Sequence, residues 1–481
     1  MPCRFHYALL SLYASRQIRH TSHGIEQAHQ NCVTSWESNG QVFHQLSQAL
    51  SVLTPRHHVT DEMWDRVYSG PDDTLESMHP SAFGFTETWL ELVFHHAERN
   101  IIACRINGGR LWEVEFALAD YVGTIPKNKS GIAHMLRHRL GKRFGWWDLP
   151  SLSRHSVCAP AMCSHEDLEG YVFVRFFGMQ VGFHYYRVMP ALQIGQAHIR
   201  EVYAWRDISL DFVIAGADSC GTTSLHKNLA KYSDIVFTSL DEDYFFATVT
   251  SLRVLPLRSQ VETFNNAVSR TRSQLLGLCN PMSFTNHLNR LRLSMITNLR
   301  IVIIICDPLG RLEKLFYNYY FCSNRGQQRP YLDKLPCYNS TVPMMQKPDW
   351  IDRQSMGTNL KKMVAMFGPR LKLLHQADLR NRPKAVFREL TEWLGVQAPF
   401  TKVMKFNRYN SISGHRTGLC RNSALVRQLR FHLESEYQLL EQLFQPRAPP
   451  ELRLRRTRCD RARDFFENRS SCDLRGRCRS D

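Results

Sequence analysis

Residues 211–246, DFVIAGADSCGTTSLHKNLAKYSDIVFTSLDEDYFF, contain the pattern that decides the fold. The apolar run Phe212–Ala215 predicts a short buried strand, residues 216–221 predict a tight loop, and Thr222–Tyr232 predict a helix. The first-turn amides of such a helix point into the loop, and the helix dipole favours negative charge there. Three hydroxyl donors follow at Thr222, Thr223 and Ser224. The stretch therefore predicts a site for a phosphate-like group.

The residue after the second loop glycine indicates which phosphate chemistry to expect. A nucleotide hydrolase of the Walker type has G-x-x-x-x-G-K-[ST], in which the lysine reaches the β- and γ-phosphates. Gly216 and Gly221 have this spacing, but Thr222 stands at the position of the lysine. The loop is therefore a poor ATPase loop, and G-x-x-x-x-G-T-T resembles instead the 5′-phosphosulfate loop of the sulfotransferase family. A chance glycine turn in an ordinary α/β protein is the alternative at this point.

The whole chain has 481 residues, a hydrophobic content of 43% and a formal net charge of +17. The length indicates about three domains, or one large domain with extensions, and the hydrophobic content allows a sizeable core. The positive charge indicates anionic partners, namely nucleotides, acidic glycans, nucleic acid or anionic membrane, or only a surface that charge keeps soluble. Tyr7–Ala14 is a candidate for the apolar core of a signal peptide, and no uncharged apolar run is long enough for a membrane span.

Fourteen cysteines are scattered without a C-x-x-C pair, which argues against a zinc ribbon and a dense disulfide framework. One or two disulfides remain open, and Cys322 with Cys337 is the closest plausible loop-closing pair. Because four crowded ligands lack the usual zinc spacing, we expect no metal site at His155, Cys158, Cys163 and His165. Sequons for N-glycosylation, usable only in a secretory compartment, stand at Asn128, Asn339 and Asn468.

The first two hundred residues are less regular than the rest. We expect a loosely structured segment over residues 1–80, with a helix around Gln41–Leu53, and an accessory region of unknown fold over 81–206. Within the accessory region, Thr86–Ala97 predicts a helix and Ile101–Ile106 predicts a strand.

From residue 207 onward, strands alternate with helices, which predicts a parallel α/β sheet that binds ligands at the carboxyl ends of its strands. The expected strands are Ile235–Thr238, Arg300–Ile305 and Leu371–Leu374. Residues 251–300 are expected to be mostly helical, and further helices are expected at Arg311–Phe321, Pro383–Leu394 and Leu425–Phe444. This domain would cover 207–445, and the arginine-rich residues 446–481 would form a disordered basic tail.

A second signature strengthens the resemblance to sulfotransferases. Residues 300–320, RIVIIICDPLGRLEKLFYNYY, are similar to the 3′-phosphate segment of that family, a strand followed by R-[DN]-P-x-x-R-x-x-S, and Asp307, Pro308 and Arg311 match it. Further matches follow the family's order at Cys279–Pro281, Leu371–Leu379 and Val386–Gly395. The resemblance covers 207–445, about half of the chain. Four motifs in order are hard to reach by chance.

The resemblance implies a P-loop-NTPase-like α/β sulfotransferase fold with an N-terminal α+β extension. It implies 3′-phosphoadenosine-5′-phosphosulfate (PAPS) as sulfuryl donor, 3′-phosphoadenosine-5′-phosphate (PAP) as product, and no metal. Glu242 before the paired phenylalanines resembles the catalytic glutamate of the carbohydrate-directed, Golgi-type branch, which implies a glycan hydroxyl as acceptor and a secretory location. The cofactor-binding residues that it implies are Ser219, Cys220, Gly221, Thr222, Thr223, Ser224, Cys306, Lys314 and Arg416.

Several of the family's cations are exchanged in this sequence. Ser219 replaces the loop lysine, Cys306 the arginine that ends the 3′-phosphate strand, Lys314 the following serine, and Cys279 the lysine of K-S-P. Cations that could compensate are Lys227, Arg408 and Arg416, together with His415. Losing one transition-state donor typically costs about 10²–10³ in rate.

Two functions therefore stay open besides active sulfuryl transfer. The first is a catalytically impaired protein of the same fold that binds a nucleotide or an acidic glycan. The second is a nucleic-acid binder that uses the basic tail, against which the absence of aromatic and basic residues interleaved as in RRM or OB folds argues. The alternative for Glu242 is a solvated acidic cluster, since Asp241 and Asp243 flank it.

Overall fold

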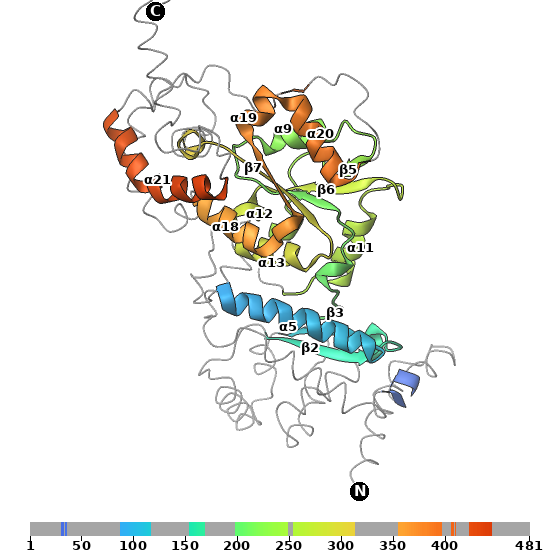
Figure 1. Ribbon diagram of the computed structural model, residues 1–481. Coiled ribbons are helices and arrows are strands. Elements are labelled where there is room, and N and C mark those ends of the chain that lie inside the picture. The colour runs from blue at the N-terminus through green and yellow to red at the C-terminus, as the bar shows by residue number, and fades with distance from the viewer. Residues whose placement is uncertain are drawn as a thin grey trace, which may run out of the picture. The chain divides into compact units, whose positions relative to one another are not determined.

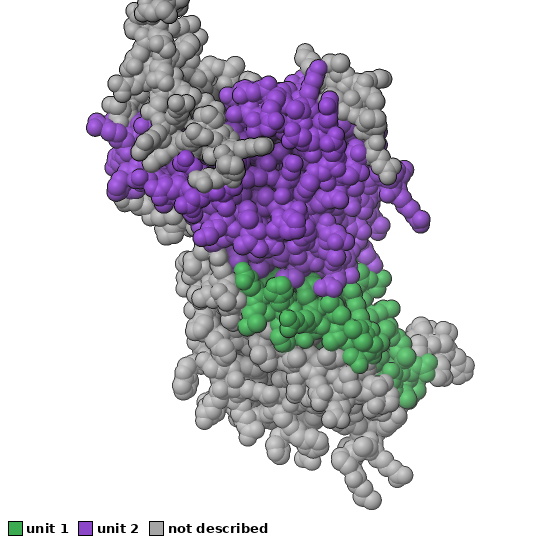
Figure 2. All heavy atoms as spheres, viewed as in Figure 1, with its two compact units in different colours: residues 1–69, 91–204, 253–261 green, residues 70–90, 205–252, 262–481 purple. Residues whose placement is uncertain are grey.

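A computed structural model describes part of the chain and groups it into two compact units. The described residues are 30–32, 34–35, 87–116, 153–168, 198–248, 254–312, 355–396, 406–407, 409 and 423–444. The first unit comprises residues 1–69, 91–204 and 253–261, and the second comprises 70–90, 205–252 and 262–481 (Figure 2). Among the described residues, no helix combines the length and the hydrophobicity that crossing a membrane requires.

The first unit consists of a long helix on a small antiparallel sheet. Helix α5 (Glu87–Ile106) precedes strand β1 (Gly109–Phe116), which pairs on either side with β2 (Ser153–Pro160) and β3 (His198–Glu201). The expected strand at Ile101–Ile106 is wrong, because these residues form the last turns of α5. Ala97, Ile101 and Cys104 are buried at helical spacing in one apolar cluster, which favours the helix over a strand.

Two disulfides strengthen the first unit. Cys104 on α5 bonds to Cys158 on β2, and Cys32 bonds to Cys163. A Cβ atom on Gly109 would lie 2.8 Å from the Cys104 sulfur and 2.9 Å from the Cys158 sulfur, so the absence of a side chain makes room for this bond. Both cysteines of the crowded His–Cys set are therefore oxidised and carry no thiolate for a metal.

The second unit is built on a sheet of five parallel strands in the order β5-β6-β4-β7-β8. Their bounds are β4 Phe212–Ile214, β5 Ile235–Phe237, β6 Leu275–Cys279, β7 Arg300–Ile305 and β8 Leu371–His375. Strand β4, which precedes the glycine loop, is central between β6 and β7. The expected α/β class, with a parallel sheet, flanking helices and an N-terminal α+β extension, is confirmed.

Helices cover both faces of this sheet (Figure 1). Helices α9 (Thr222–Leu229) and α20 (Pro383–Leu394) share an apolar cluster with alternate residues of β4 and β7, such as Ile214 and Ile304. Helices α12 (Met282–Thr285), α13 (His287–Met295) and α18 (Met356–Phe367) lie on the opposite side of the sheet (Figure 1). Side chains of a strand alternate between faces, which explains why a continuous run such as RIVIII is buried on both.

Strand β6 contradicts the expected helical content of residues 251–300. Leu275–Cys279 forms a strand between β5 and β4. Its Gly277 packs against the ring of Phe212, and a Cβ atom at this position would lie 2.3 Å from the Phe212 Cζ. Helix α11 (Arg258–Asn266) precedes it, and α12 and α13 follow it, so the expectation of helices is correct for other parts of this stretch. The apolar run 275–279 is only long enough for a strand. Periodicity alone does not distinguish so short a run from part of a helix, and helices lie on both sides of it.

Other expected elements occur where they were predicted. Strand β7 and helix α20 have the expected bounds, and the long final helix is α21 (Ser423–Leu443). Shorter elements are η6 (Trp205–Asp207), α10 (Phe245–Thr248), η8 (Gly368–Arg370) and α19 (Gln376–Asn381). The expected helix around Gln41–Leu53, the Cys322–Cys337 pair, the three sequons and the tail after 446 lie outside the described residues.

Candidate functional site

The glycine loop lies at the carboxyl edge of the sheet and packs closely on β7. A Cβ atom on Gly216 would lie 2.8 Å from the carbonyl oxygen of Ile304, so only glycine fits there. Ser219 and Gly221 both have positive φ angles, 62° and 110°, which turn the chain sharply into α9. Gly221 is the N-cap of α9 and offers no side-chain acceptor to the first helical turn. The strand, tight loop and helix N-terminus that the sequence predicts are therefore present, and this cradle has a geometry that suits a bound anion.

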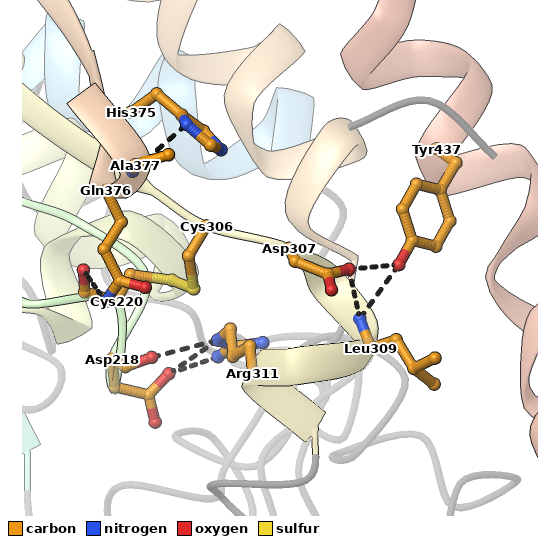
Figure 3. Close-up of a disulfide and its surroundings, with 10 residues drawn as sticks. All are labelled: Asp218, Cys220, Cys306, Asp307, Leu309, Arg311, His375, Gln376, Ala377 and Tyr437. Carbon is orange, nitrogen blue, oxygen red and sulfur yellow. Dashed lines mark hydrogen bonds and ion pairs between the residues drawn. A yellow bond between two sulfur atoms is a disulfide. The ribbon is translucent and has the colours of Figure 1, made fainter. Parts of the chain in front are cut away.

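Four contacts hold the loop against the neighbouring strands, and Figure 3 shows three of them. The amide of Ala217 donates to the Ile304 oxygen at 3.2 Å, and Gln376 Nε2 donates to the Cys220 oxygen at 2.6 Å. Cys220 forms a disulfide with Cys306, directly after β7. An ion pair between the loop and the helical residues 308–312 is the fourth contact. The loop is therefore fixed on its β7 and β8 side.

The ion pair joins Asp218 of the loop to Arg311 (Figure 3). Arg311 Nε donates to Asp218 Oδ1 at 3.1 Å and to the Asp218 main-chain oxygen at 3.2 Å, and Nη2 donates to the same carboxylate oxygen. The Arg311 side chain is 2% exposed and that of Asp218 is 27% exposed. The one cation of the 3′-phosphate signature that matches the family thus binds a carboxylate of the chain itself.

Helix α21 supports the turn after β7. Tyr437 Oη donates to Asp307 Oδ1 and accepts from the amide of Leu309 at 3.1 Å (Figure 3). Burial and the neighbouring Asp307 raise the pKa of Tyr437 well above its ordinary value, so its hydroxyl stays protonated. A helix more than a hundred residues away in sequence therefore orients Asp307 beside the disulfide.

Glu242 also lies at the carboxyl edge of the sheet. The amide of the next residue, Asp243, donates to the Cys279 oxygen at the end of β6 at 2.9 Å. Tyr244 Oη donates to Glu242 Oε2 at 2.5 Å, which orients the carboxylate. Burial, and secondly the charge of Glu242, raises the pKa of the Cys279 thiol, which stays protonated. The amide of Asn280 in turn donates to the Ile214 oxygen of β4 at 3.0 Å, so the β6 end links Glu242 to the loop strand.

Helix α9 holds the segment that carries Glu242. The ring of His226 packs on Phe237 with centroids 4.1 Å apart. Lys227 Nζ lies 3.1 Å from Asp241 Oδ1, so this candidate compensating cation is paired with a carboxylate. One eight-residue helix therefore contacts both the cradle, at its first turn, and the Glu242 segment, along its second half.

The burial of His226 predicts a pH-dependent stability. Burial, and secondly Lys227, lowers the pKa of His226 below its ordinary value of 6.5, so the unfolded chain binds the proton more readily than the folded chain. The free energy of unfolding should therefore fall as the pH falls through about 6.5. We expect His226→Gln, which removes the titration, to reduce the loss of Tm between pH 7 and pH 5, measured by thermal unfolding. The exposed His432→Gln should leave that loss unchanged, and an equal effect of both variants would contradict the explanation.

The three hydroxyl residues after the loop have different environments. Thr222 is buried, whereas Thr223 and Ser224 are half-buried. Ser224 Oγ donates to the Tyr409 oxygen at 3.2 Å and accepts from the Tyr409 amide at 3.0 Å. One turn later, Asn228 makes the same reciprocal pair of bonds with the main chain of Asn407. Ser224 thus binds the main chain of Tyr409, whereas the sequence predicted only a contact with the cofactor.

The remaining expected contacts divide into two groups. The first group lies together in the loop, on the first turn of α9 and directly after β7, and consists of Ser219, Cys220, Gly221, Thr222, Thr223, Ser224 and Cys306. Lys314, Arg408, His415 and Arg416 lie outside the described residues. No motif in the sequence marks Gln376, Tyr244 or Tyr437 as site residues. Gln376 comes two residues after the predicted strand Leu371–Leu374, at the edge where parallel sheets bind ligands, and this signal could have found it. In the described part of the chain, no cluster of His, Cys, Asp and Glu side chains is arranged to hold a metal ion.

Comparison with known proteins gives similarity in structure alone. No protein-family model and no curated protein matches this sequence. Solved structures similar to the chain include three sulfotransferases. A sulfotransferase from Alicyclobacillus acidocaldarius has a TM-score of 0.36 at 17% identity, over 50% of this chain and 98% of that one.

The other two are more distant. The sulfotransferase domain from the curacin biosynthetic pathway has a TM-score of 0.28 at 12% identity, over 40% of this chain and 75% of that one. A mouse sulfotransferase complexed with PAP has a TM-score of 0.27 at 12% identity, over 40% and 62% of the two chains. Similarities of this size are too slight to support a function. The function of this chain is inferred instead from the geometry of its loop and sheet.

Proposed function

We propose that this protein transfers a sulfuryl group from PAPS to a hydroxyl of a carbohydrate-type acceptor. The observation that carries the proposal is the position of the glycine loop and Glu242 at one edge of the sheet, where α9 follows the loop and contacts the segment before Glu242 through Phe237 and Asp241. A phosphate-binding loop and a carboxylate are the two parts that sulfuryl transfer to a hydroxyl needs.

The loop would bind the donor through its main chain. The amides at Gly221, Thr222 and Thr223 and the hydroxyls of the two threonines are the donors that the first turn of α9 offers to a 5′-phosphosulfate. Residues 306–314 would contact the 3′-phosphate. Oriented amides stabilise charge on the sulfuryl and bridging oxygens without reorganising during the reaction, which is the larger part of such catalysis.

Glu242 would act as the general base. Its carboxylate accepts the proton of the acceptor hydroxyl while the acceptor oxygen bonds to sulfur and the bond from sulfur to the bridging phosphate oxygen breaks, releasing PAP. The hydrogen bond from Tyr244 holds Oε2, which leaves Oε1 as the oxygen for the proton. The sulfuryl group thus passes from the donor to the acceptor oxygen, and the proton passes from that oxygen to Glu242.

The disulfides support a secretory location and, with it, a glycan acceptor. Three disulfides lie among the described residues, and disulfides of this kind persist in oxidising compartments. The formal charge of +17 suits an acidic polysaccharide. A Golgi-type carbohydrate sulfotransferase fits both features.

A second candidate function is nucleotide or acidic-glycan binding without turnover. Two observations favour it: Arg311 is paired with Asp218, and the position expected to carry an arginine is Cys306, bonded to Cys220. Both features lower the positive charge available for a transition state.

One pair of measurements tests the two candidates. Calorimetry with PAP should show binding in the micromolar to millimolar range, and transfer of labelled sulfate from PAPS to mixed glycans should be detectable. Binding without transfer would leave the second candidate, and no binding at millimolar PAP would overturn the first candidate and the nucleotide-binding form of the second.

Tyr244→Phe should reduce transfer without abolishing it. The variant removes one hydrogen bond that orients the Glu242 carboxylate, and bonds of this kind contribute about 1.5–3 kcal/mol, so we expect a roughly 10- to 100-fold lower kcat. The measurement is steady-state transfer with the acceptor in excess, and KM for PAPS should stay unchanged. A change in KM for PAPS with a constant kcat would show that Tyr244 acts on donor binding instead.

A further inference from the structure

The loop contains a negative charge where an anion is expected to bind. Asp218 is three residues before Gly221, and its carboxylate binds the buried guanidinium of Arg311 through two nitrogen atoms. The Asp218 side chain is 27% exposed, so its charge is near the surface of the cradle, not buried behind it. The Asp218 carboxylate would therefore compete with a bound phosphate for the guanidinium of Arg311.

We propose that Asp218 is a specificity-determining residue that weakens the binding of anionic nucleotides at this site, by occupying Arg311 and by repelling the 5′-phosphate. The inference rests on the proposed function, because it concerns the same donor site. Weak binding of anionic nucleotides would then have two causes, the carboxylate of Asp218 and the cations that the loop lacks.

The other loop contacts make this inference testable. The loop is held by the Cys220–Cys306 disulfide, by Gln376 and by the Ala217 amide, none of which involves the Asp218 side chain. Asp218→Asn keeps an oxygen that can accept from Arg311 Nε, so the buried guanidinium retains a partner. The variant therefore removes one charge and leaves the loop in place.

The expected effect is electrostatic. At several ångströms and an effective dielectric constant near 20, removing one negative charge beside a phosphate should tighten PAP binding on the order of 10-fold. The gain should shrink between 50 and 300 mM salt, because salt screens charges at a partly exposed site. Binding of adenosine, which carries no phosphate, should stay unchanged.

Two further variants control for the change of charge and of shape. Asp234→Asn changes the net charge equally, but Asp234 precedes the amino end of β5, at the opposite edge of the sheet, and should leave PAP affinity unchanged. Asp218→Glu keeps the charge and should bind PAP no more tightly than the wild type. Thermal unfolding in the absence of ligand shows that each variant is folded.

Calorimetry of the full chain with PAP and with adenosine distinguishes the outcomes. Tighter PAP binding by Asp218→Asn alone, with adenosine unaffected, supports the inference. If the wild type binds PAP and Asp218→Asn binds it equally or more weakly, the inference is overturned and the proposed function stands. If only Asp218→Asn binds, the inference holds and the wild type does not use PAPS. If neither binds, both are overturned.

Discussion

Replacing Glu242 by glutamine should lower sulfuryl transfer from PAPS by about 10²–10⁴-fold, the range that a general base contributes. The amide cannot accept the proton of the acceptor hydroxyl at neutral pH, whereas its shape is nearly that of the carboxylate. Tyr244 can still donate to the amide oxygen, so the segment between β5 and α10 should keep its conformation. The measurement is transfer of labelled sulfate to mixed glycans, with PAP affinity determined on the same protein.

Asp241→Asn is the matched control for Glu242→Gln. It removes a neighbouring carboxylate that is 78% exposed and paired with Lys227, and we expect less than about a threefold change in rate. If the two variants lose the same small amount, the acidic cluster is only a solvated surface. If Glu242→Gln keeps full activity, the assignment of the base is wrong.

Removing the Cys220–Cys306 disulfide should lower the stability of the second unit strongly. The bond joins residues 86 positions apart, and closing a loop of that length lowers the entropy of the unfolded chain by an amount worth on the order of 4–5 kcal/mol, within a usual range of about 2–5. Cys220→Ala and Cys306→Ala should each lower the free energy of unfolding in urea by this amount. PAP affinity should fall too, because the loop loses its covalent tie to the end of β7.

The double variant tests whether the effect comes from the bond. Both single variants already break it, so Cys220→Ala combined with Cys306→Ala should cost little more than either alone. Cys279→Ala, which removes a buried free thiol from the adjacent strand, should cost only about 1 kcal/mol. Additive losses in the double variant would show that the two sulfurs act separately.

The parts of the fold that the sequence predicted are those with strong local signals. Strand β7 is almost entirely β-branched, and α20 begins with Pro383 and ends before Gly395, whose φ of 78° needs glycine. Strand β6 was missed because its reason for being a strand is not local. Gly277 is required by the ring of Phe212 on the neighbouring strand, 65 residues earlier in the chain.

The candidate site shows the same division. The glycine spacing and the following hydroxyls predicted an anion cradle, and the structure has that loop geometry. The sequence predicted Cys220 and Cys306 as two separate cofactor contacts, with Cys306 in place of the family's arginine, whereas they form one bond. The ion pair between Asp218 and Arg311 was not predicted, because 93 residues separate them and no local pattern joins them. Pairings of this kind depend on which strands are neighbours in the sheet.

The contacts of α9 with residues 406–409 also determine the order in which the protein can be completed. Ser224 and Asn228 bind a segment that follows them by 179–185 residues. At a synthesis rate of about 5–20 residues per second, the helix leaves the ribosome roughly 10–40 s before these partners exist. The partner of Cys220 comes 86 residues after it, about midway through this interval. The nascent chain therefore carries its glycine loop for some time with neither support, and the loop is fixed only after these later segments have been made.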